Sequence, residues 1–520
     1  MLQKKEINQT IIPSECLRPC NLMFLIPPNS EFAEFIQTCD ELVYREPIIL
    51  QRINSDLDKC AIIKKEERLK DKHWELSQTK TLPNLAMEFP AISIDAMRLQ
   101  GGRPRMSAYL TYLFLMIRGY YGGVKSSQFE LFLRESKSIQ LLMYNCNDGK
   151  MPGGSTISDN INWVSNETRL FIFDAQIRMI INEKLDDFNE LTIDSTSVSG
   201  NITWPTDSGI LTALVRRIFS RGNKLHLFGI SNISERRFPS IIKEMNELSK
   251  QINFTVKKPN SNAKRKKLYR KFLKEAKGAH KAFVSELEKV KNKFISVNIE
   301  PSRYQKLKRL IDWMSEDVES LFKVIGYCSQ RVFKNQSTPS SEKVLSLSDK
   351  SAGFIKKGDR EPVIGYKPQI GRSKNGFISA FSVPKGNAAD SGEFLNIVRD
   401  GIGRTGVIPI IISTDDGYAN RPAREELLSL GVKSVSISGS KGKKMTGEED
   451  WESEEYIKIR NDRSAVESLM FTIKYCFDFG RVMRRGIDNV RAELLEKVLA
   501  YNFCRIIEIR NKNCLLEISA

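Results

Sequence analysis

Three acidic residues stand where a carboxylate could do chemistry. Asp194 is embedded in the segment LTIDSTSV, whose alternation of apolar and polar residues predicts a strand. A carboxylate buried in such a strand is costly unless it has a partner. Asp415 directly follows VIPIIIST, an apolar run that predicts a strand covered on both faces. It therefore lies at the carboxyl end of that strand, where open α/β sheets bind their ligands.

The third acid, Glu467, lies in the predicted helix SAVESLMFTIKYCF. The buried stripe of this helix is expected to consist of Val466, Met470, Ile473 and Phe477, which follow one another in steps of three and four. Arg463, Glu467 and Lys474 share another face, because steps of four and seven residues return to the same side. Glu467 is thus predicted to lie beside the buried stripe with a cation on either side.

Carboxylates that converge from two strands and a helix would supply hard oxygen ligands for Mg²⁺ or Mn²⁺. Two such ions can activate a water or a 3′-hydroxyl and stabilise the leaving oxygen of a phosphodiester. Each residue also has a plainer interpretation. Asp194 and Asp415 could make local turns, and Glu467 could simply pair with Arg463 one helical turn away.

Taken together, the pattern resembles the DDE transposases of bacterial insertion sequences. The likeness rests on LTIDSTSVSGNITWPTDSGIL, on GYKPQIGRSKNGFISAFSVPKGNAADSGEF, on the Asp-x-Gly-Tyr element within STDDGYAN, and on RSAVESLMFTIK. The last segment has the family spacing of Arg, three residues, Glu, six residues, Lys. The Tyr that usually stands three residues before this Arg is replaced by Arg460.

The resemblance implies a role for each matched residue. Asp194, Asp415 (rather than Asp416) and Glu467 would be the catalytic residues and would hold two Mg²⁺ or Mn²⁺ ions. Arg463 and Lys474 would contact DNA phosphates. The fold implied is α/β, an RNase H-like mixed sheet with a long helical insertion after the first strand.

Upstream of the first strand, helices are predicted. GGRPR at 101–105 leads into an apolar helix at 106–121, followed by a helix in VKSSQFELFLRES and a longer one from Ser155 or Thr156 through 181. Short helices joined by glycine-containing turns are typical of helix-turn-helix DNA readers and equally of small helical bundles. Arg103 and Arg105 at the helix entry are candidate DNA contacts.

The remaining predictions concern the sheet and its insertion. Strands are expected at 362–369 and 376–383, joined at Asn375-Gly376, and at 434–438, followed by a charged loop at 440–458. Residues 206–345 are predicted to form a basic helical insertion. Eleven Lys or Arg against one acid lie between Lys257 and Lys281. Lys264, Arg265, Lys266 and Lys267 among them either track DNA or form a solvated helical face.

Composition narrows the class of protein. Net charge is +18, which favours a polyanionic partner. The nine cysteines are dispersed and only three histidines are present, so a structural zinc site is not expected. Apolar runs are too short for a membrane span. A soluble intracellular protein is therefore expected, and the resemblance implies that it lies in the bacterial cytoplasm, associated with the nucleoid.

These observations predict two regions: a mostly helical DNA-binding region at 1–185, helix-turn-helix-like at about 101–183, and a catalytic domain at 186–520. The predicted function is a transposase that binds the terminal inverted repeats of an insertion sequence, cleaves at their ends and joins them to target DNA. Its partners would be double-stranded DNA and a second copy of the chain on paired ends. The alternatives are an RNase H-like nuclease without strand transfer and a catalytically inactive, domesticated DNA-binding protein.

Overall fold

The chain divides into two compact units. The computed structural model describes residues 30–78, 106–146, 149–233, 237–255, 261–357 and 361–519. Of these, residues 30–61, 106–201 and 355–519 form the core unit, and residues 62–78 and 202–354 form the insertion unit. The core unit therefore combines the N-terminal helices with all of the larger sheet.

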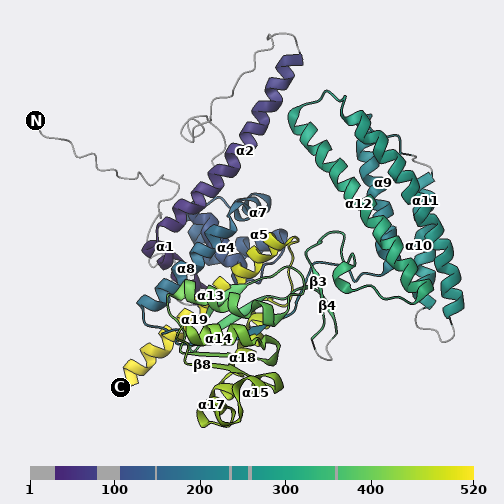
Figure 1. Ribbon diagram of the computed structural model, residues 1–520. Coiled ribbons are helices and arrows are strands. Elements are labelled where there is room, and N and C mark those ends of the chain that lie inside the picture. Colours follow the sequence, from purple (N-terminus) through teal and green to yellow (C-terminus); the bar gives the residue numbers. More distant parts are fainter. Residues whose placement is uncertain are drawn as a thin grey trace, which may run out of the picture. The chain divides into compact units, whose positions relative to one another are not determined.

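A five-stranded mixed sheet lies at the centre of the core unit (Figure 1). Its strand order is β6-β5-β1-β7-β8, with β1 (Glu190–Ser195) in the middle. β1 pairs antiparallel with β5 (Gln369–Ser373), which pairs antiparallel with β6 (Ile378–Ser382). On its other side β1 runs parallel to β7 (Ile411–Thr414), which runs parallel to β8 (Ser434–Ile437). The predicted α/β class is thus confirmed.

The two faces of this sheet are covered by different helices. On one face, Leu191 and Ile193 of β1 enter an apolar core with residues of α13 (Asp390–Thr405) and α14 (Arg421–Ser429). Because side chains alternate along a strand, Thr192 and Asp194 face the opposite side. There, α17 (Glu454–Asp462) contacts β7 and β8, and α18 (Ala465–Cys476) contacts β1. Asp194 therefore lies on the α17–α18 face.

A small second sheet follows β1. It has the order β2-β4-β3 and comprises β2 (Val198–Ser199), β3 (Gly353–Ile355) and β4 (Val363–Tyr366). β2 pairs antiparallel with β4, with Val198 opposite Tyr366. The predicted strand 191–198 is therefore two strands that belong to different sheets.

The helices of the N-terminal part are α1 (Glu31–Arg45), the first part of α2 (Ile48–Gln78), α4 (Ala108–Tyr120), α5 (Ser126–Glu135), α6 (Lys137–Cys146), α7 (Gly154–Trp163) and α8 (Asn166–Asn182). Of these, α1, α4 and α8 contact the long helix α19 (Ile487–Ser519), while α7 packs against α4 and α5, and α6 packs against α5. α4 comes so near to α19 that a β-carbon on Gly119 would lie 2.2 Å from the backbone oxygen of Glu496. Glycine is needed there for close helix packing.

A buried carboxylate joins these helices electrostatically. Glu496 of α19 accepts hydrogen bonds from Arg118 of α4 at 2.9 Å and from Arg169 of α8 at 2.9 Å. Arg484, in the loop before α19, binds the same carboxylate at 2.9 Å. All but Arg484 are almost fully buried, and charges in that setting are stable only when paired. Helices from both ends of the sequence thus form one folded body.

The insertion unit contains a bundle of four helices, α9 (Asp207–His226), α10 (Arg237–Thr255), α11 (Asn262–Phe294) and α12 (Pro301–Lys334). Their apolar faces form one continuous core that includes Leu214, Phe272, Phe283 and Leu321. Asp317 of α12 is buried in this unit and binds Arg217 and Arg221 of α9. The segment predicted to be a basic helical insertion is therefore an ordered bundle.

Three predicted elements differ from the structure. The long helix expected from 155 to 181 is broken into α7 and α8, because Ser165 caps α8 and its backbone N–H donates to Asp56 at 2.9 Å. The hairpin at Asn375-Gly376 joins β5 to β6, since an extra strand lies between β4 and the turn. The loop expected at 440–458 contains α15 (Ser440–Thr446), α16 (Glu448–Trp451) and the start of α17.

Across the described part of the chain, no helix combines the length and the apolar character that a membrane span requires.

Candidate active site

The central strand places Asp194 close to the positively charged side chain of a lysine. The carboxylate of Asp194 lies 3.9 Å from the ammonium group of Lys357, and it accepts the backbone N–H of Ser195 at 2.6 Å. Lys357 also donates to the backbone and side-chain oxygens of Ser195. The carboxylate of Asp194 is thus fixed from two directions at the end of β1.

Burial raises the pKa of the Asp194 carboxyl above its ordinary value, and the negative charge of Asp415 adds to the rise. Lys357, the Ser195 N–H and Arg463 act in the opposite direction. The charges of Asp415 and Arg463 are therefore near enough to act on Asp194. Asp415 comes from β7, the parallel neighbour of β1, so the sheet itself brings the two aspartates together.

The two consecutive aspartates after β7 have different surroundings. Asp415 caps a short 3₁₀ helix (Asp416–Tyr418) by accepting the N–H of Gly417 at 3.0 Å. Asp416 accepts the backbone N–H groups of Lys441 and Gly442 at 2.8 and 3.1 Å, at the beginning of α15. The carboxylate of Asp416 therefore has a structural task, and Asp415 is the one whose charge acts on Asp194.

Tyr418 connects this site to a buried polar network. Its hydroxyl donates to Gln369 at the start of β5, and the amide of Gln369 donates to Asp390 at 3.0 Å. Asp390 also forms an ion pair with Lys367 at 2.7 Å, in which both side chains are buried. Burial raises the pKa of Tyr418, and the charges of Asp390, Asp194 and Asp415 raise it further, so this hydroxyl stays protonated as a donor.

Glu467 lies apart from the two aspartates. Its side chain is 66% exposed and forms an ion pair of 3.3 Å with Arg463, one turn earlier. Within the described ranges, no three His, Cys, Asp or Glu side chains form a group that could hold a metal ion. The structure thus brings Asp194 and Asp415 together, whereas Arg463 pairs with Glu467 and its charge also acts on Asp194.

The chemistry of the donors fits a hard divalent cation at the aspartates. Asp194 and Asp415 offer carboxylate oxygens, the ligand type that such cations prefer. Burial raises the pKa of Asp194, the charge of Asp415 adds to the rise, and a bound cation would offset the repulsion between the two carboxylates. Glu467 is instead paired with Arg463. The aspartate pair is therefore the part of the predicted triad that already suits a metal ion.

The other residues of the signature lie on or beside α18. Val466, Met470 and Ile473 are buried as expected, and Phe477 is buried just after the helix ends. Lys474 is half-buried on the same helix. Arg460, which replaces the usual Tyr, lies over the ring of Trp451 at 4.0 Å and donates to the Trp451 carbonyl at 3.2 Å. Arg460 therefore holds α16 against α17.

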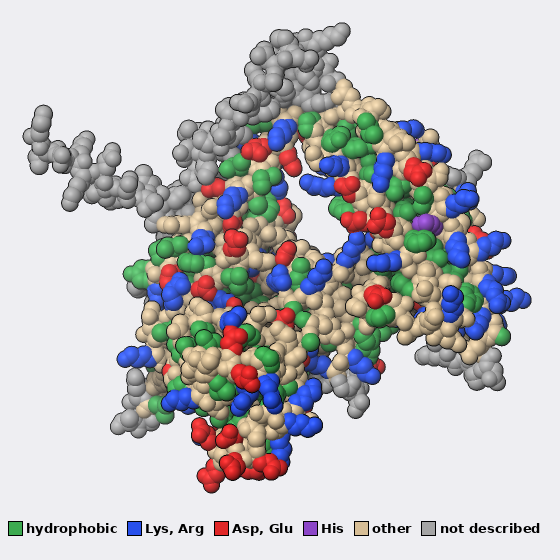
Figure 2. Space-filling view, viewed as in Figure 1, with side chains coloured by type: hydrophobic (Ala, Val, Ile, Leu, Met, Phe, Trp, Pro, Cys, Tyr) green, Lys and Arg blue, Asp and Glu red, His purple; other side chains and the backbone are tan. Residues whose placement is uncertain are grey.

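The predicted DNA contacts outside the sheet have different outcomes. Arg103 and Arg105 lie outside the described residues. Lys264, Arg265, Lys266 and Lys267 lie in the first turns of α11, where Lys264 and Lys267 are exposed and the other two are half-buried. Figure 2 shows Lys and Arg gathered along the surface of the four-helix bundle to which α11 belongs. Tyr269 and Phe272 point into the bundle core, so the basic side chains occupy the outer face.

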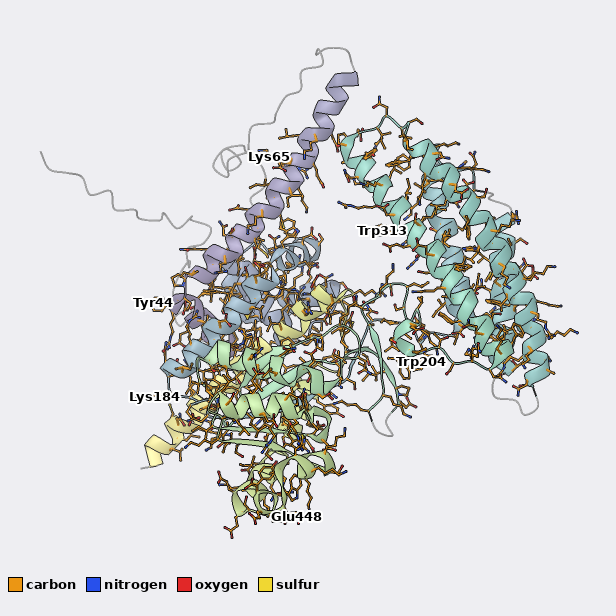
Figure 3. All side chains as sticks on the ribbon, in the orientation of Figure 1. Tyr44, Lys65, Lys184, Trp204, Trp313 and Glu448 are labelled. Atoms are coloured by element: carbon orange, nitrogen blue, oxygen red, sulfur yellow. The ribbon has the colours of Figure 1, made fainter. Side chains whose placement is uncertain are left out.

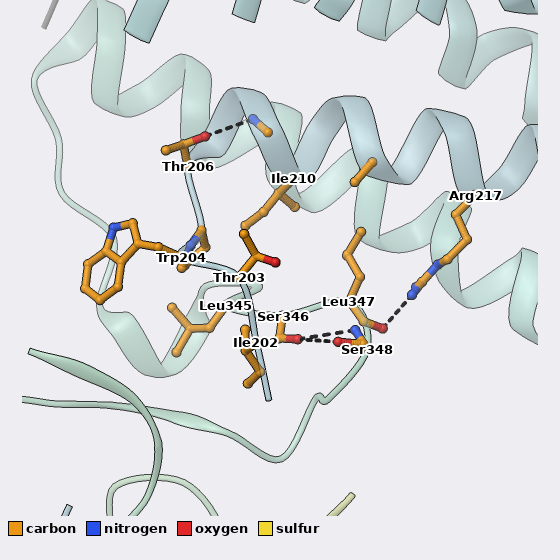
Figure 4. A pocket seen from close by; sticks show the side chains of 13 residues that line it. Ile202, Thr203, Trp204, Thr206, Ile210, Arg217, Leu345, Ser346, Leu347 and Ser348 are labelled. Carbon is orange, nitrogen blue, oxygen red and sulfur yellow. Dashed lines mark hydrogen bonds between the residues drawn. The ribbon is translucent and has the colours of Figure 1, made fainter. Parts of the chain in front are cut away.

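A cavity of about 440 Å³ lies in the insertion unit, where the chain enters and leaves the bundle (Figure 4). It is lined by Trp204, Ile210 and Arg217 on the entering side and by Leu345, Ser346 and Leu347 on the leaving side. Arg217 donates to the Leu347 carbonyl, which ties the two segments together. Trp204 is among the aromatic side chains labelled in Figure 3. The centroid of its ring lies 6.4 Å from that of Phe354. The cavity contains no acidic residue.

Three residues of the site were not predicted: Lys357, Lys367 and Asp390. Lys367 stands between apolar neighbours in IGYKPQIG, and an isolated charge in such a segment indicates a buried partner. Asp390 begins α13, where an acidic residue is common in any helix and does not by itself indicate a site. Lys357 follows β3, a strand of only three residues, by two positions, and no sequence pattern marked it.

The comparison with protein families gave one result. Residues 326–503 match the model of the transposase DDE domain. The match contains Asp415, Arg463, Glu467 and Lys474, and it begins after the strand that carries Asp194. No curated protein matched the chain. No solved structure matched it either. The match supports an enzyme of the nuclease and transposase class that acts on DNA. The match over residues 326–503 confirms the resemblance of this chain to the DDE transposases of insertion sequences.

Proposed function

We propose that this protein is a transposase that binds the terminal inverted repeats of its element, cleaves the DNA at their ends and joins the 3′-hydroxyl to target DNA. The observation that carries the proposal is the pairing of Asp194 and Asp415 at adjacent strand ends within a chain that has a transposase DDE domain. Two partly buried carboxylates that repel each other at the ends of neighbouring strands are an unfavourable arrangement unless a cation binds there.

The sheet that holds the two aspartates is proposed to be RNase H-like. Support comes from its order β6-β5-β1-β7-β8, from the antiparallel pairing of the first three strands and from the parallel pairing of the last three. The long helical bundle after β1 agrees with the insertion that the resemblance implies. The proposed domain plan is a DNA-binding region at 1–185 and a catalytic domain at 186–520.

Asp194 and Asp415 would hold Mg²⁺ or Mn²⁺, with Glu467 as the third ligand once it leaves Arg463. Two such ions would activate the attacking oxygen and stabilise the leaving one. Lys357 keeps the Asp194 carboxylate in place, and Tyr418 holds the segment after Asp415 against β5. When Arg463 is released from Glu467, its guanidinium can bind a phosphate of the DNA strand together with Lys474.

The partners proposed are double-stranded DNA, as terminal repeats and as target, and a second copy of the chain on paired ends. The basic outer face of α11 would follow the DNA backbone, because a row of lysines neutralises phosphates without reading bases. The site of action proposed is the nucleoid in the bacterial cytoplasm.

Incubation of the full chain with DNA that carries the element ends and a target tests this function in Mg²⁺. Joined products are the expected result, and cleavage without joining would indicate a nuclease instead. Binding without either reaction would indicate an inactive DNA-binding protein. Asp194→Asn and Asp415→Asn should both abolish cleavage and leave end binding within a few fold. Near-normal cleavage by either variant would refute the assignment of the metal ligands.

A further inference from the structure

Two large aromatic side chains lie exposed on α18 next to the proposed third metal ligand. Phe471 is 63% exposed and Tyr475 is 74% exposed. Their rings are 4.3 Å apart between centroids and are tilted by 39°. Glu467, Phe471 and Tyr475 follow one another at intervals of four residues, so all three lie on one face of the helix. The catalytic glutamate and the aromatic pair therefore share a surface.

This aromatic pair is not part of the packing of the core unit. Val466, Leu469, Met470 and Ile473 are the residues that bury α18 against its neighbours. A mutual contact one turn apart removes only part of each ring from water. Single exposed apolar residues are common, whereas two adjacent large rings beside a proposed active site indicate a binding surface.

The small area of the two rings and the residues around them favour a small planar partner. Ser468 and Thr472 lie beside the rings, and the hydroxyl of Thr472 is used within the helix at 3.0 Å. A stable protein interface buries about 800 Å² on each partner, far more than two rings can offer. Nucleic-acid bases are planar, and they stack on exposed aromatic side chains without regard to sequence.

Charge supports the same partner. Lys474 lies on α18 beside Tyr475, and Arg463 precedes the helix. Cations next to aromatic rings are the usual arrangement for single-stranded nucleic acid, because the cations bind the backbone and the rings bind the bases.

We propose that Phe471 and Tyr475 form a stacking surface for unpaired bases of the DNA strand beside the cleavage site. The inference rests on the proposed function, because it takes Glu467 to mark the scissile phosphate. Four residues of helix rise about 6 Å, and successive nucleotides of one strand are about 3.4 Å apart. A strand that ran along α18 would thus place bases about two and about four nucleotides from that phosphate opposite the rings.

The test compares binding to a blunt duplex with binding to the same duplex carrying a single-stranded thymidine tail of about four nucleotides. The measurement is fluorescence anisotropy of the full chain in EDTA, so that no cleavage occurs. Wild type should bind the tailed duplex roughly tenfold or more tightly than the blunt one, since one stacked base contributes about that factor. Replacing both rings by alanine should remove the preference and leave blunt-duplex affinity unchanged.

Two matched variants sharpen this test. Phe471→Leu with Tyr475→Leu keeps an apolar surface but removes the aromatic faces, so the tail preference should also disappear. Phe322→Ala removes a ring of the insertion unit that is 68% exposed and should keep the preference. Melting curves should show all variants folded, because each replaced side chain is mostly in solvent.

A wild-type protein without tail preference would overturn the proposal, and so would leucine variants that retain it. If the alanine pair instead abolished self-association in sedimentation while tail binding persisted, the surface would bind a second copy and the proposal would be wrong. Failure of the proposed function gives a different result, namely no metal-dependent cleavage of element ends. Asp194→Asn should keep the tail preference although it cannot cleave.

Discussion

The ion pair between Lys367 and Asp390 allows a quantitative test of how the site is supported. Its atoms are 2.7 Å apart, and the two side chains are only 10% and 11% exposed. Removing one partner of a buried pair typically costs about 3–5 kcal/mol, because the other charge remains buried without compensation. Lys367 has a second acceptor, the Ala388 carbonyl at 3.4 Å. We therefore expect Asp390→Asn to lower the free energy of unfolding of the core unit by about 3 kcal/mol.

The reverse change should be milder. In Lys367→Met, Asp390 still accepts from Gln369 and lies in the first turn of α13, where the helix dipole favours a negative charge. The double variant should be more stable than Asp390→Asn alone, since it leaves no buried charge unpaired. Urea unfolding followed by circular dichroism on the four proteins gives the coupling energy directly.

The same cycle tests whether the network positions the site. Asp390 holds Gln369, which holds Tyr418, and Tyr418 follows Asp415 by three residues. A displacement of about 1 Å at a reacting group can cost about a hundredfold in rate. Asp390→Asn should therefore slow cleavage by at least tenfold at temperatures where the variant is folded. A loss of stability below about 1 kcal/mol, or an unchanged rate in the folded variant, would refute this reasoning.

Three further predictions concern the metal ions and the basic side chains. Mn²⁺ should replace Mg²⁺ in cleavage. Ca²⁺ should allow DNA binding without efficient cleavage, because its looser coordination does not fix the reacting groups. A cleavage rate in Ca²⁺ equal to that in Mg²⁺ would contradict the two-ion mechanism. Arg463→Ala should lower the free energy of unfolding by only about 0.3–0.5 kcal/mol, as expected for its exposed pair with Glu467. The same variant should cleave DNA more than tenfold more slowly. A nearly wild-type rate would show that the pair is only structural. Replacing the four basic residues 264–267 by Gln should flatten the slope of log K against log salt by up to about 3.6, roughly 0.9 for each lost phosphate contact; an unchanged slope would leave a solvated helical face.

Local patterns predicted those elements whose partners are near in sequence. The buried stripe of α18 and the strands β7 and β8 follow from periodicity alone, because their apolar residues must face a core. Within the run before Asp415, β7 begins only at Ile411, after Pro409, which has no N–H to donate to a neighbouring strand. The neighbouring placement of Asp194 and Asp415 required the family pattern, since nothing local joins β1 to β7.

What the sequence did not predict depends on residues far apart along the chain. The break between α7 and α8 is stabilised by Asp56, which also accepts from the Thr168 hydroxyl. The sequence from residue 155 onward could not reveal this interaction, because Asp56 lies about 100 residues earlier in the chain. Lys357 and Asp194 are 163 residues apart in the sequence, and only the folded chain brings their side chains to 3.9 Å. The pairing of Glu467 with Arg463 was the plainer of two interpretations, and the structure shows it.

The position of α19 has a consequence for how this protein is made. Gly119 of α4 and the buried arginines at 118 and 169 find their partners on α19, whose residues leave the ribosome long after theirs. At about 5–20 residues per second, roughly 15 to 60 s pass between the synthesis of α8 and that of α19. During this interval the apolar faces of α4 and α8 lack the helix that covers them. Nascent chains should therefore need a holding chaperone, and any product that stops before α19 should aggregate rather than compete with the finished protein for DNA.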